Sequence, residues 1–335
     1  MVPEQERLTT VKRFRYYLRL PQVFSSYKRK KVHLSYLPVR LWVETTSICN
    51  LRCIMCPNKD LKKEEKGFME FNLFQKIIDE ARPFVFDVNL IHRGEGLLHH
   101  DFSRLVRYAH EAGITTKFHT NATLLDEKKS FELIEAGLDQ ISFSFDGYDK
   151  KTYEGIRVNA NFEKTVANIV QFLKVKQKLK SKKPYAILEL INFPDLYKPI
   201  DSRQKQEFLE NFRGLPLNGV EVKEMHNWAG EIGEGRKKRK YVPCTFLWQA
   251  LIIFWDGSVL PCTQDFHGYY ILGNVKDMSL AQIWNDEKIV RLRRKVLQQD
   301  IDDLKTCSQC DRLWREQILG IPKEYLWKFL LKRMP

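Results

Sequence analysis

The sequence contains no long hydrophobic run, and this absence excludes several classes of protein. No apolar segment approaches the roughly 18 residues that a membrane-spanning helix needs. The residues from Met1 to Arg13 are charged and have no apolar core, unlike a secretory signal. The interleaved aromatic and basic residues of an RNA-binding module are also missing, so we expect no nucleic-acid partner. These absences together predict a cytoplasmic protein.

Cysteine is scarce, and its distribution is uneven. The seven cysteines among 335 residues fall into two sets, at 49–56 and 244–310. An odd number without a signal peptide argues against a disulfide framework and favours metal ligation in a reducing compartment. Hydrophobic residues make up 43% and charged residues 29% of the chain, which is long enough for one large α/β domain and a smaller one.

Positive charge is in excess, with a net charge of +14, and part of it lies in short runs at 28–31, 180–183 and 236–240. Such runs usually form solvated surface; the alternative is attraction of an anionic partner such as a phosphorylated substrate or a membrane. Residues 1–38 form a basic leader rich in aromatic side chains. We expect this leader to pack across the next domain, with peripheral contact to anionic lipid as the alternative.

Short apolar runs alternate with longer amphipathic stretches from residue 41 to residue 224. The apolar runs predict strands at 41–45, 85–92, 115–119, 140–145, 185–191 and 220–224. The amphipathic stretches predict helices at 73–81, 102–112, 127–135, 162–179 and 204–212. Such alternation is typical of parallel βα units. Six units predict an α/β fold, a partial (β/α)6 TIM-like barrel, whose active site would lie at the carboxyl ends of the strands.

Three cysteines follow the first predicted strand in the order C-x3-C-x2-C: Cys49, Cys53 and Cys56. Three thiolates leave one iron of a cubane [4Fe–4S] cluster without a protein ligand, free to bind a small molecule. A zinc site is an alternative, because zinc also takes cysteines at C-x2-C spacing. Unrelated thiols in a reducing cytosol are another.

The segment from Thr45 to Cys56 resembles the cluster loop of the radical S-adenosylmethionine (SAM) enzymes, and the resemblance covers about residues 41–225. It implies that the open iron chelates SAM and that reduction of the cluster releases a 5′-deoxyadenosyl radical. The electron would come from a flavodoxin- or ferredoxin-type donor.

The same resemblance implies contacts to SAM from the first two strand ends. Met55 has the position whose backbone contacts adenine in the family. Gly94 and Glu95 stand in the turn, Gly-Gly-Glu-Pro in the family, that caps the SAM amino group. Two residues depart from this pattern, because Arg93 replaces the first glycine and Gly96 replaces the proline.

Further SAM contacts are implied after the fourth strand. Ser142 and Ser144 face the same side of that strand, and Ser144, nearer its carboxyl end, is the one we expect to contact SAM. Arg157 matches the arginine motif of the family, where a guanidinium pairs with the SAM carboxylate. His226-Asn227-Trp228 lies where family members complete the adenosine or substrate pocket.

The second cysteine set, Cys244, Cys262, Cys307 and Cys310, supplies four thiolates, enough to ligate another [4Fe–4S] cluster completely. A structural zinc ion is the alternative. Asp256-Gly257 between two apolar runs predicts a hairpin that carries Cys244 and Cys262 toward each other. The region resembles the SPASM and twitch auxiliary-cluster domains of radical SAM enzymes, and its cysteine spacing resembles that of the deoxy-scyllo-inosamine dehydrogenase-like twitch enzymes.

These observations predict a leader (1–38), a radical SAM core (39–228), a linker (229–240), a small auxiliary-cluster domain (241–315) and a helical tail (316–335). The resemblance implies an oxidoreductase that removes hydrogen from a small polar substrate, such as a sugar or cyclitol, with the auxiliary cluster as electron acceptor. The basic charge favours a phosphorylated substrate. The alternatives are maturation of a ribosomally made peptide, membrane-associated modification of a glycan or lipid, and a non-catalytic scaffold.

Overall fold

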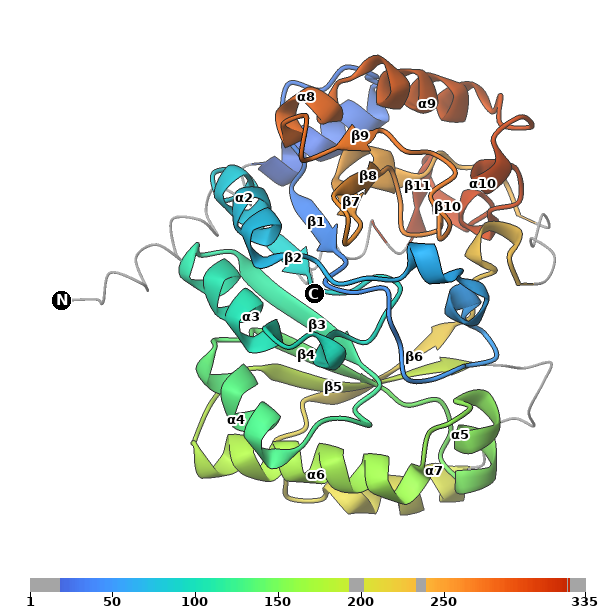
Figure 1. The fold of residues 1–335 in the computed structure, drawn as a ribbon. Coiled ribbons are helices and arrows are strands. Elements are labelled where there is room, and N and C mark those ends of the chain that lie inside the picture. Colours follow the sequence, from blue (N-terminus) through green and yellow to red (C-terminus); the bar gives the residue numbers. More distant parts are fainter. Residues whose placement is uncertain (1–18, 193–201, 233–238, 324, 326–335) are drawn as a thin grey trace.

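A computed structural model of the protein describes residues 19–192, 202–232, 239–323 and 325 (Figure 1). Its main feature is a nine-stranded sheet in the order β6-β5-β4-β3-β2-β1-β7-β8-β9. The strands are β1 (Arg40–Val43), β2 (Asp87–Asn89), β3 (Thr115–Thr120), β4 (Gln140–Ser144), β5 (Tyr185–Asn192), β6 (Gly219–Glu224), β7 (Ala250–Ile253), β8 (Ser258–Leu260) and β9 (Gly273–Asn274). The α-helices are α2 (Phe71–Ala81), α3 (Phe102–Glu111), α4 (Glu127–Glu135), α5 (Lys150–Ile156), α6 (Phe162–Lys178), α7 (Ser202–Leu209), α8 (Leu280–Trp284), α9 (Glu287–Gln298) and α10 (Lys305–Ser308).

The predicted alternation of strands and helices is confirmed for β1 to β6, which are parallel and adjacent in chain order. Strand β2 is shorter than the predicted 85–92, and α5 was not predicted. Within the described residues β6 pairs only with β5, so the sheet stays open rather than closing into a barrel.

The two faces of the sheet differ in polarity, because side chains alternate along each strand. One face carries apolar side chains such as Phe118, Phe143 and Leu188, all fully buried. This face packs on the helices; Phe143, for example, meets Phe172 of α6 with ring centroids 5.4 Å apart. The opposite face carries polar groups. The ion pair Arg40–Asp87 lies at the amino-terminal ends of β1 and β2.

The C-terminal cysteine region extends the main sheet instead of forming a separate one. The predicted hairpin around Asp256-Gly257 is confirmed as antiparallel β7 and β8. Strand β7 pairs in parallel with β1, a contact that the sequence did not indicate. The two cysteine regions are therefore joined through adjacent strands of one sheet (Figure 1).

The described part of the leader packs mainly on the C-terminal region, and it also contacts the domain that follows it in sequence, where Arg19 Nη1 donates to Phe84 O over 2.7 Å. Figure 1 shows this blue segment beside α8 and α9. The hydroxyl of Tyr27 donates to Pro243 O over 2.8 Å, and that of Tyr36 donates to Trp248 O over 2.8 Å. Trp284 Nε1 in turn donates to Tyr36 O over 2.7 Å. Leader residues 1–18 lie outside the described residues.

The beginning of the expected helical tail forms a small hairpin instead. Strands β10 (Gln317–Ile318) and β11 (Ile321–Pro322) pair around Leu319 and Gly320, both with positive φ, which makes a tight turn. Apart from residues 323 and 325, the rest of the tail lies outside the described residues. No helix in the described ranges combines the length and apolarity that crossing a bilayer requires.

Candidate active site

The loop after β1 brings Cys49, Cys53 and Cys56 into one packed apolar cluster with Leu51 and Ile156. Burial raises the pKa of the Cys49 thiol to about 11 and that of Cys56 to about 12, and the neighbouring cysteines act in the same direction. Thiols this close together lose their protons readily only when a cation binds them. The donor set therefore suits a group that carries positive metal charge.

Asparagine side chains tie this cysteine loop to the carboxyl end of β3. Asn50 Nδ2 donates to Thr123 Oγ1 over 2.8 Å, and Asn121 Nδ2 donates to Asn50 Oδ1 over 2.9 Å. On the other side of the loop, Arg52 N donates to Val158 O and Ile54 N to Ile156 O, each over 3.0 Å. The cysteines are thus held between β3 and the segment after α5.

Gly94 lies directly against the backbone before Cys49. A Cβ at this position would lie 2.6 Å from Ile48 O and closer still to Thr46 O. Only glycine permits this approach, which places the turn after β2 beside the cysteine loop. The adjacent backbone N–H of Glu95 donates to Ile48 O over 2.9 Å.

The carboxylate of Glu95 is buried and bound by three donors. Thr120 Oγ1 donates to Oε1 over 2.8 Å, Asn121 N to Oε2 over 2.7 Å and Leu97 N to Oε1 over 3.1 Å. Burial nevertheless raises its pKa. A carboxylate has about four acceptor sites, so capacity for one further donor remains.

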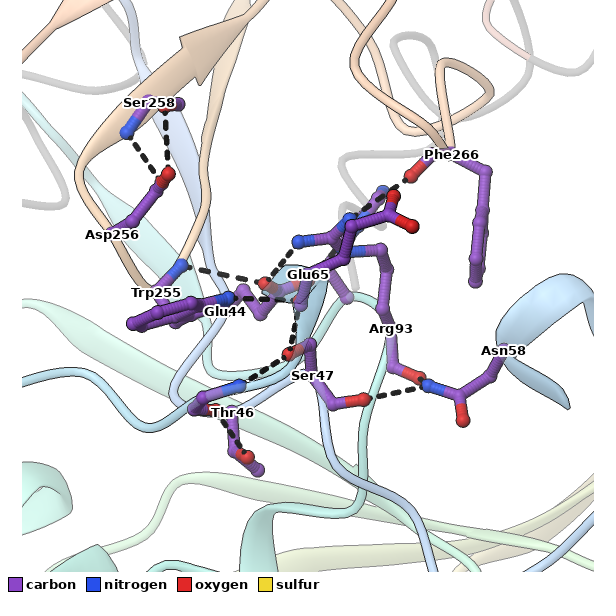
Figure 2. Close-up of polar contacts among 12 residues, drawn as sticks. Glu44, Thr46, Ser47, Asn58, Glu65, Arg93, Trp255, Asp256, Ser258 and Phe266 are labelled. Carbon is purple, nitrogen blue, oxygen red and sulfur yellow. Dashed lines mark hydrogen bonds and ion pairs between the residues drawn. The ribbon is translucent and has the colours of Figure 1, made fainter. Parts of the chain in front are cut away.

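Arg93, which replaces the first family glycine, forms a buried pair with Glu44 (Figure 2). Its Nε and Nη2 lie 2.7 and 2.9 Å from the two oxygens of Glu44, and its guanidinium stacks 3.6 Å from the ring centroid of Phe254. Its Nη1 also donates to Phe266 O over 3.4 Å. Arg93, although it departs from the family pattern, therefore joins the end of β2 to the loop after β8.

Asn58 is a site residue that the sequence did not reveal. Its Nδ2 donates to Ser47 O over 2.7 Å and to Arg93 O over 2.6 Å, as Figure 2 shows. It lies in the 3-10 helix η1 (Pro57–Asp60), so it links the residues after the third cysteine to both flanking turns. No local pattern distinguishes such an asparagine from a surface one.

Of the two serines of β4, Ser142 is fully buried, and its hydroxyl has no hydrogen-bond partner in the part of the chain that the structure describes. Ser144 is half-buried at the end of the strand. Ser144 stands opposite Glu189 in the register of β4 and β5. Both serines face the polar side of the sheet, as expected from strand alternation.

Arg157 is buried beside Cys53 and Asp146. Its Nη2 donates to Asp146 Oδ2 over 2.6 Å, and its Nη1 lies 3.9 Å from Cys53 Sγ. Burial alone would lower the pKa of this guanidinium, but Asp146 and Cys53 raise it above its usual value. Asp146 was missed in the sequence, although an acidic residue directly after a buried strand is a signal that could have found it.

The four C-terminal cysteines border one cavity, together with Gln264 and Arg312. Gln264 Oε1 and Arg312 Nε are buried there without a hydrogen-bond partner. In the described ranges no three cysteine, histidine or acidic side chains converge as they would on a single ion. The cysteines instead line the wall of a shared space, an arrangement that fits a larger group.

The segment after β6 contacts both cysteine regions. Trp228 Nε1 donates to Met55 O over 3.1 Å, and its ring meets Phe266 edge to face. Asn227 donates through Nδ2 to Gln309 O over 2.7 Å and through its backbone to Asp311 Oδ2 over 3.0 Å. The segment therefore touches the first cysteine loop and the residues around Cys310.

The polar face of the sheet carries a cluster of ionisable groups that the sequence did not reveal. His119 Nδ1 lies 3.5 Å from Glu189 Oε2, and Lys223 Nζ bonds to the same carboxylate. Burial lowers the pKa of His119, so its imidazole is neutral near pH 7. Period-two alternation could have placed these residues on one face, but not the pairing among strands.

Two family models match the chain in these same regions. The radical SAM superfamily matches residues 43–181, and an iron–sulfur cluster-binding domain, SPASM, matches residues 244–311. The first includes Cys49, Cys53, Cys56, Arg93 and Arg157, and the second begins at Cys244 and includes Cys310.

Curated relatives span most of the chain. A tungsten-containing aldehyde ferredoxin oxidoreductase cofactor-modifying protein of Pyrococcus furiosus is 27% identical over 322 residues, covering 81% of this chain and 88% of the relative. A SAM-dependent 2-deoxy-scyllo-inosamine dehydrogenase of Niallia circulans is 22% identical over 284 residues, covering 81% of this chain and 92% of the relative.

Solved structures share the fold. BtrN in complex with AdoMet and 2-DOIA aligns with a TM-score of 0.56 and 19% identity, over 83% of this chain and 94% of that one. Streptococcus suis SuiB bound to its precursor peptide SuiA aligns with a TM-score of 0.55 and 16% identity, over 90% of this chain and 78% of SuiB. These likenesses show the fold, and the two family models identify the chain as a radical SAM enzyme with a C-terminal SPASM iron–sulfur domain, whose cofactors are SAM and iron–sulfur clusters.

Proposed function

We propose that this protein is a radical SAM oxidoreductase that withdraws two electrons from a small polar substrate, a sugar- or cyclitol-like molecule. The observation that carries this proposal is the cavity bordered by Cys244, Cys262, Cys307 and Cys310. Four thiolates complete the protein ligation of a cluster and leave no iron open for substrate, which favours electron acceptance over substrate binding.

The bound cofactors would supply hydrogen-atom removal from a substrate carbon and acceptance of the remaining electron. The residues that would hold SAM are Met55, Gly94, Glu95, Ser144 and Arg157, and those that would hold the clusters are Cys49, Cys53 and Cys56 in the core and the four cysteines of the C-terminal region. The core at 39–228 and the auxiliary domain at 241–315 remain our proposed boundaries. A flavodoxin- or ferredoxin-type protein would donate the first electron.

The polar face of the sheet supports a small polar substrate. His119 is only 25% and Glu189 15% exposed, so a ligand hydroxyl there would meet groups that are largely removed from water. With Nδ1 directed to Glu189, the Nε2 of a neutral His119 can accept the proton that an alcohol loses when it becomes a carbonyl. The excess of positive charge favours a phosphorylated substrate.

The dehydrogenase relative supports this class of substrate, because it acts on 2-deoxy-scyllo-inosamine. The relative from Pyrococcus furiosus favours a second candidate, modification of the cofactor of another enzyme. Substrate assays separate the two candidates.

The test uses anaerobically reconstituted protein with SAM, dithionite and a panel of aminocyclitols, sugar phosphates and the cofactor of a tungsten-containing aldehyde ferredoxin oxidoreductase. We expect one compound class to stimulate 5′-deoxyadenosine formation and to yield a product two hydrogens lighter. Cys53→Ala should abolish 5′-deoxyadenosine. Cys262→Ala should retain 5′-deoxyadenosine formation but lose the oxidised product.

Two results would contradict this proposal. Stimulation by a peptide alone would favour the maturase alternative. Full yield of oxidised product from Cys262→Ala would exclude electron acceptance at the C-terminal site.

A further inference from the structure

The guanidinium of Arg157 is directed at a cysteine of the core site. Its Nη1 lies 3.9 Å from Cys53 Sγ, within hydrogen-bonding range for sulfur, while its Nη2 is bound to Asp146. Both charged residues are nearly inaccessible, with 6% of Arg157 and none of Asp146 exposed. In this environment a charge acts strongly on its neighbours because little water screens it.

The backbone fixes the position of Arg157 relative to Cys53. The hydrogen bonds Arg52 N to Val158 O and Ile54 N to Ile156 O flank the two residues on either side. Arg157 directly follows α5, where the helix ends. This short ladder places the guanidinium-bearing residue opposite the cysteine.

Asp146 fixes the other end of the guanidinium. Its Oδ1 accepts from Ile191 N over 2.7 Å and its Oδ2 from Arg157 over 2.6 Å, so its carboxylate is oriented by β5. Among the described residues Arg157 Nε has no hydrogen-bond partner, and the guanidinium reaches the cysteine loop through the contact of Nη1 with Cys53. The chain from Ile191 through Asp146 and Arg157 thus ends at a cluster ligand.

We propose that Arg157, oriented by Asp146, donates a hydrogen bond to the Cys53 sulfur and thereby sets the reduction potential of the SAM-binding cluster. Hydrogen bonds to ligand sulfurs and nearby charge are established determinants of iron–sulfur potentials. This role is distinct from the SAM-carboxylate contact that the family resemblance implies. It depends on the core cluster alone and not on the proposed substrate.

The two residues should shift the midpoint potential in opposite directions. Reduction adds a negative charge to the cluster, and the Arg157 donor stabilises that charge. Arg157→Gln should therefore make the potential more negative. Asp146→Asn removes a buried negative charge and should make it more positive.

The experiment is an equilibrium redox titration of the reconstituted protein without SAM, followed by electron paramagnetic resonance. The signal of the auxiliary cluster serves as an internal reference, and its potential should stay constant. Asp87→Asn is the matched control, because it also removes the carboxylate of a buried Arg–Asp pair, but at the opposite end of the strands. Its core-cluster potential should equal that of the wild type.

Unchanged potentials in both variants would overturn the proposal. If Arg157→Gln then also weakened SAM binding, Arg157 would serve the SAM carboxylate alone. Iron and sulfide analysis would show whether Arg157→Gln takes up the core cluster. If it does not, the midpoint potentials of Asp146→Asn and Arg157→Lys test the proposal instead. A positive shift of the potential in Asp146→Asn would support the proposal, and wild-type potentials in both variants would contradict it.

Discussion

At the scale of single residues, backbone contact at Gly94 determines whether the cysteine loop can lie against the end of β2. Gly94→Ala would push its new methyl group into the carbonyls of Thr46 and Ile48. We expect the variant to lose most of the iron of the core site, about half of the total, in an assay of iron and sulfide per chain. Gly219→Ala is the control, because its Cβ would meet only an ordinary contact at 4.0 Å from Ile187. Normal iron content in Gly94→Ala would show that the loop can shift.

His226 should make the stability of the protein depend on pH. Burial lowers its pKa from 6.5 to about 3, and Arg312, Arg315 and Lys223 act in the same direction. Because the unfolded chain binds a proton that the folded chain does not, this contribution to stability decreases as pH falls from about 6.5 toward 3. His226→Gln should therefore lose less thermal stability than the wild type between pH 7.5 and 5.5, measured anaerobically. Equal losses would show that His226 is accessible to protons in the folded state.

At the scale of elements, the segment after β6 connects the two cofactor regions. Trp228 and Ala229 both have positive φ, 47° and 55°, a conformation that costs free energy for residues with a side chain. The contacts of Trp228 with Met55 and Phe266 hold this strained geometry. Such a segment adds a second connection between two regions that the pairing of β1 with β7 already joins.

Asn227→Ala tests this element. The side chain makes one hydrogen bond to Gln309 O and accepts one from Asp311 N, and losing both should cost about 2 kcal/mol. Because both bonds lie beside Cys310, the variant should destabilise the C-terminal site locally. A chelator should then remove iron from the C-terminal site faster than from the core site. Asn211→Ala, which removes one local bond to Phe208, is the control. Equal release rates from both sites would argue against a local role.

At the scale of the whole molecule, the leader contributes to the C-terminal region. Tyr27, Leu34 and Tyr36 are buried there, at 8%, 4% and 6% exposure. Burying each such side chain stabilises by about 1.5–3 kcal/mol, a large share of the roughly 5–15 kcal/mol of a typical domain. The described part of the leader, residues 19–38, thus contributes to the folded core despite its basic composition.

Truncation separates this role from membrane attachment. Removal of residues 1–38 should yield a protein that aggregates or fails to retain auxiliary iron, whereas removal of residues 1–18 keeps all the contacts named above and should leave iron content unchanged. Sedimentation of the 1–18 truncation and the full chain with anionic vesicles tests the lipid alternative. Normal iron and solubility after removal of 1–38 would contradict the packing role.

Some of the site was predictable because local patterns report local chemistry. Cysteine spacing predicted two candidate metal-ligand sets, and period-two alternation placed Ser142 and Ser144 on one face of β4. Asn58 was not predictable, and neither were the partners of Asp146 and His119, since these contacts join residues far apart in the chain. In the sequence, Arg93 was only a departure from the glycine of the family turn. Its pairing with Glu44 in the structure explains why an arginine can stand at this position.

The sequence by itself determined the order of strands and helices, the hairpin at Asp256-Gly257 and the residues available to hold cofactors, because periodicity, turn residues and cysteine spacing are encoded over short stretches. The tertiary structure alone decided that β7 pairs with β1, that the leader lies against α8 and α9, and that Arg157 meets Cys53. These contacts join segments distant in the chain, and their free energy comes from burial and hydrogen bonding between surfaces that no local pattern specifies.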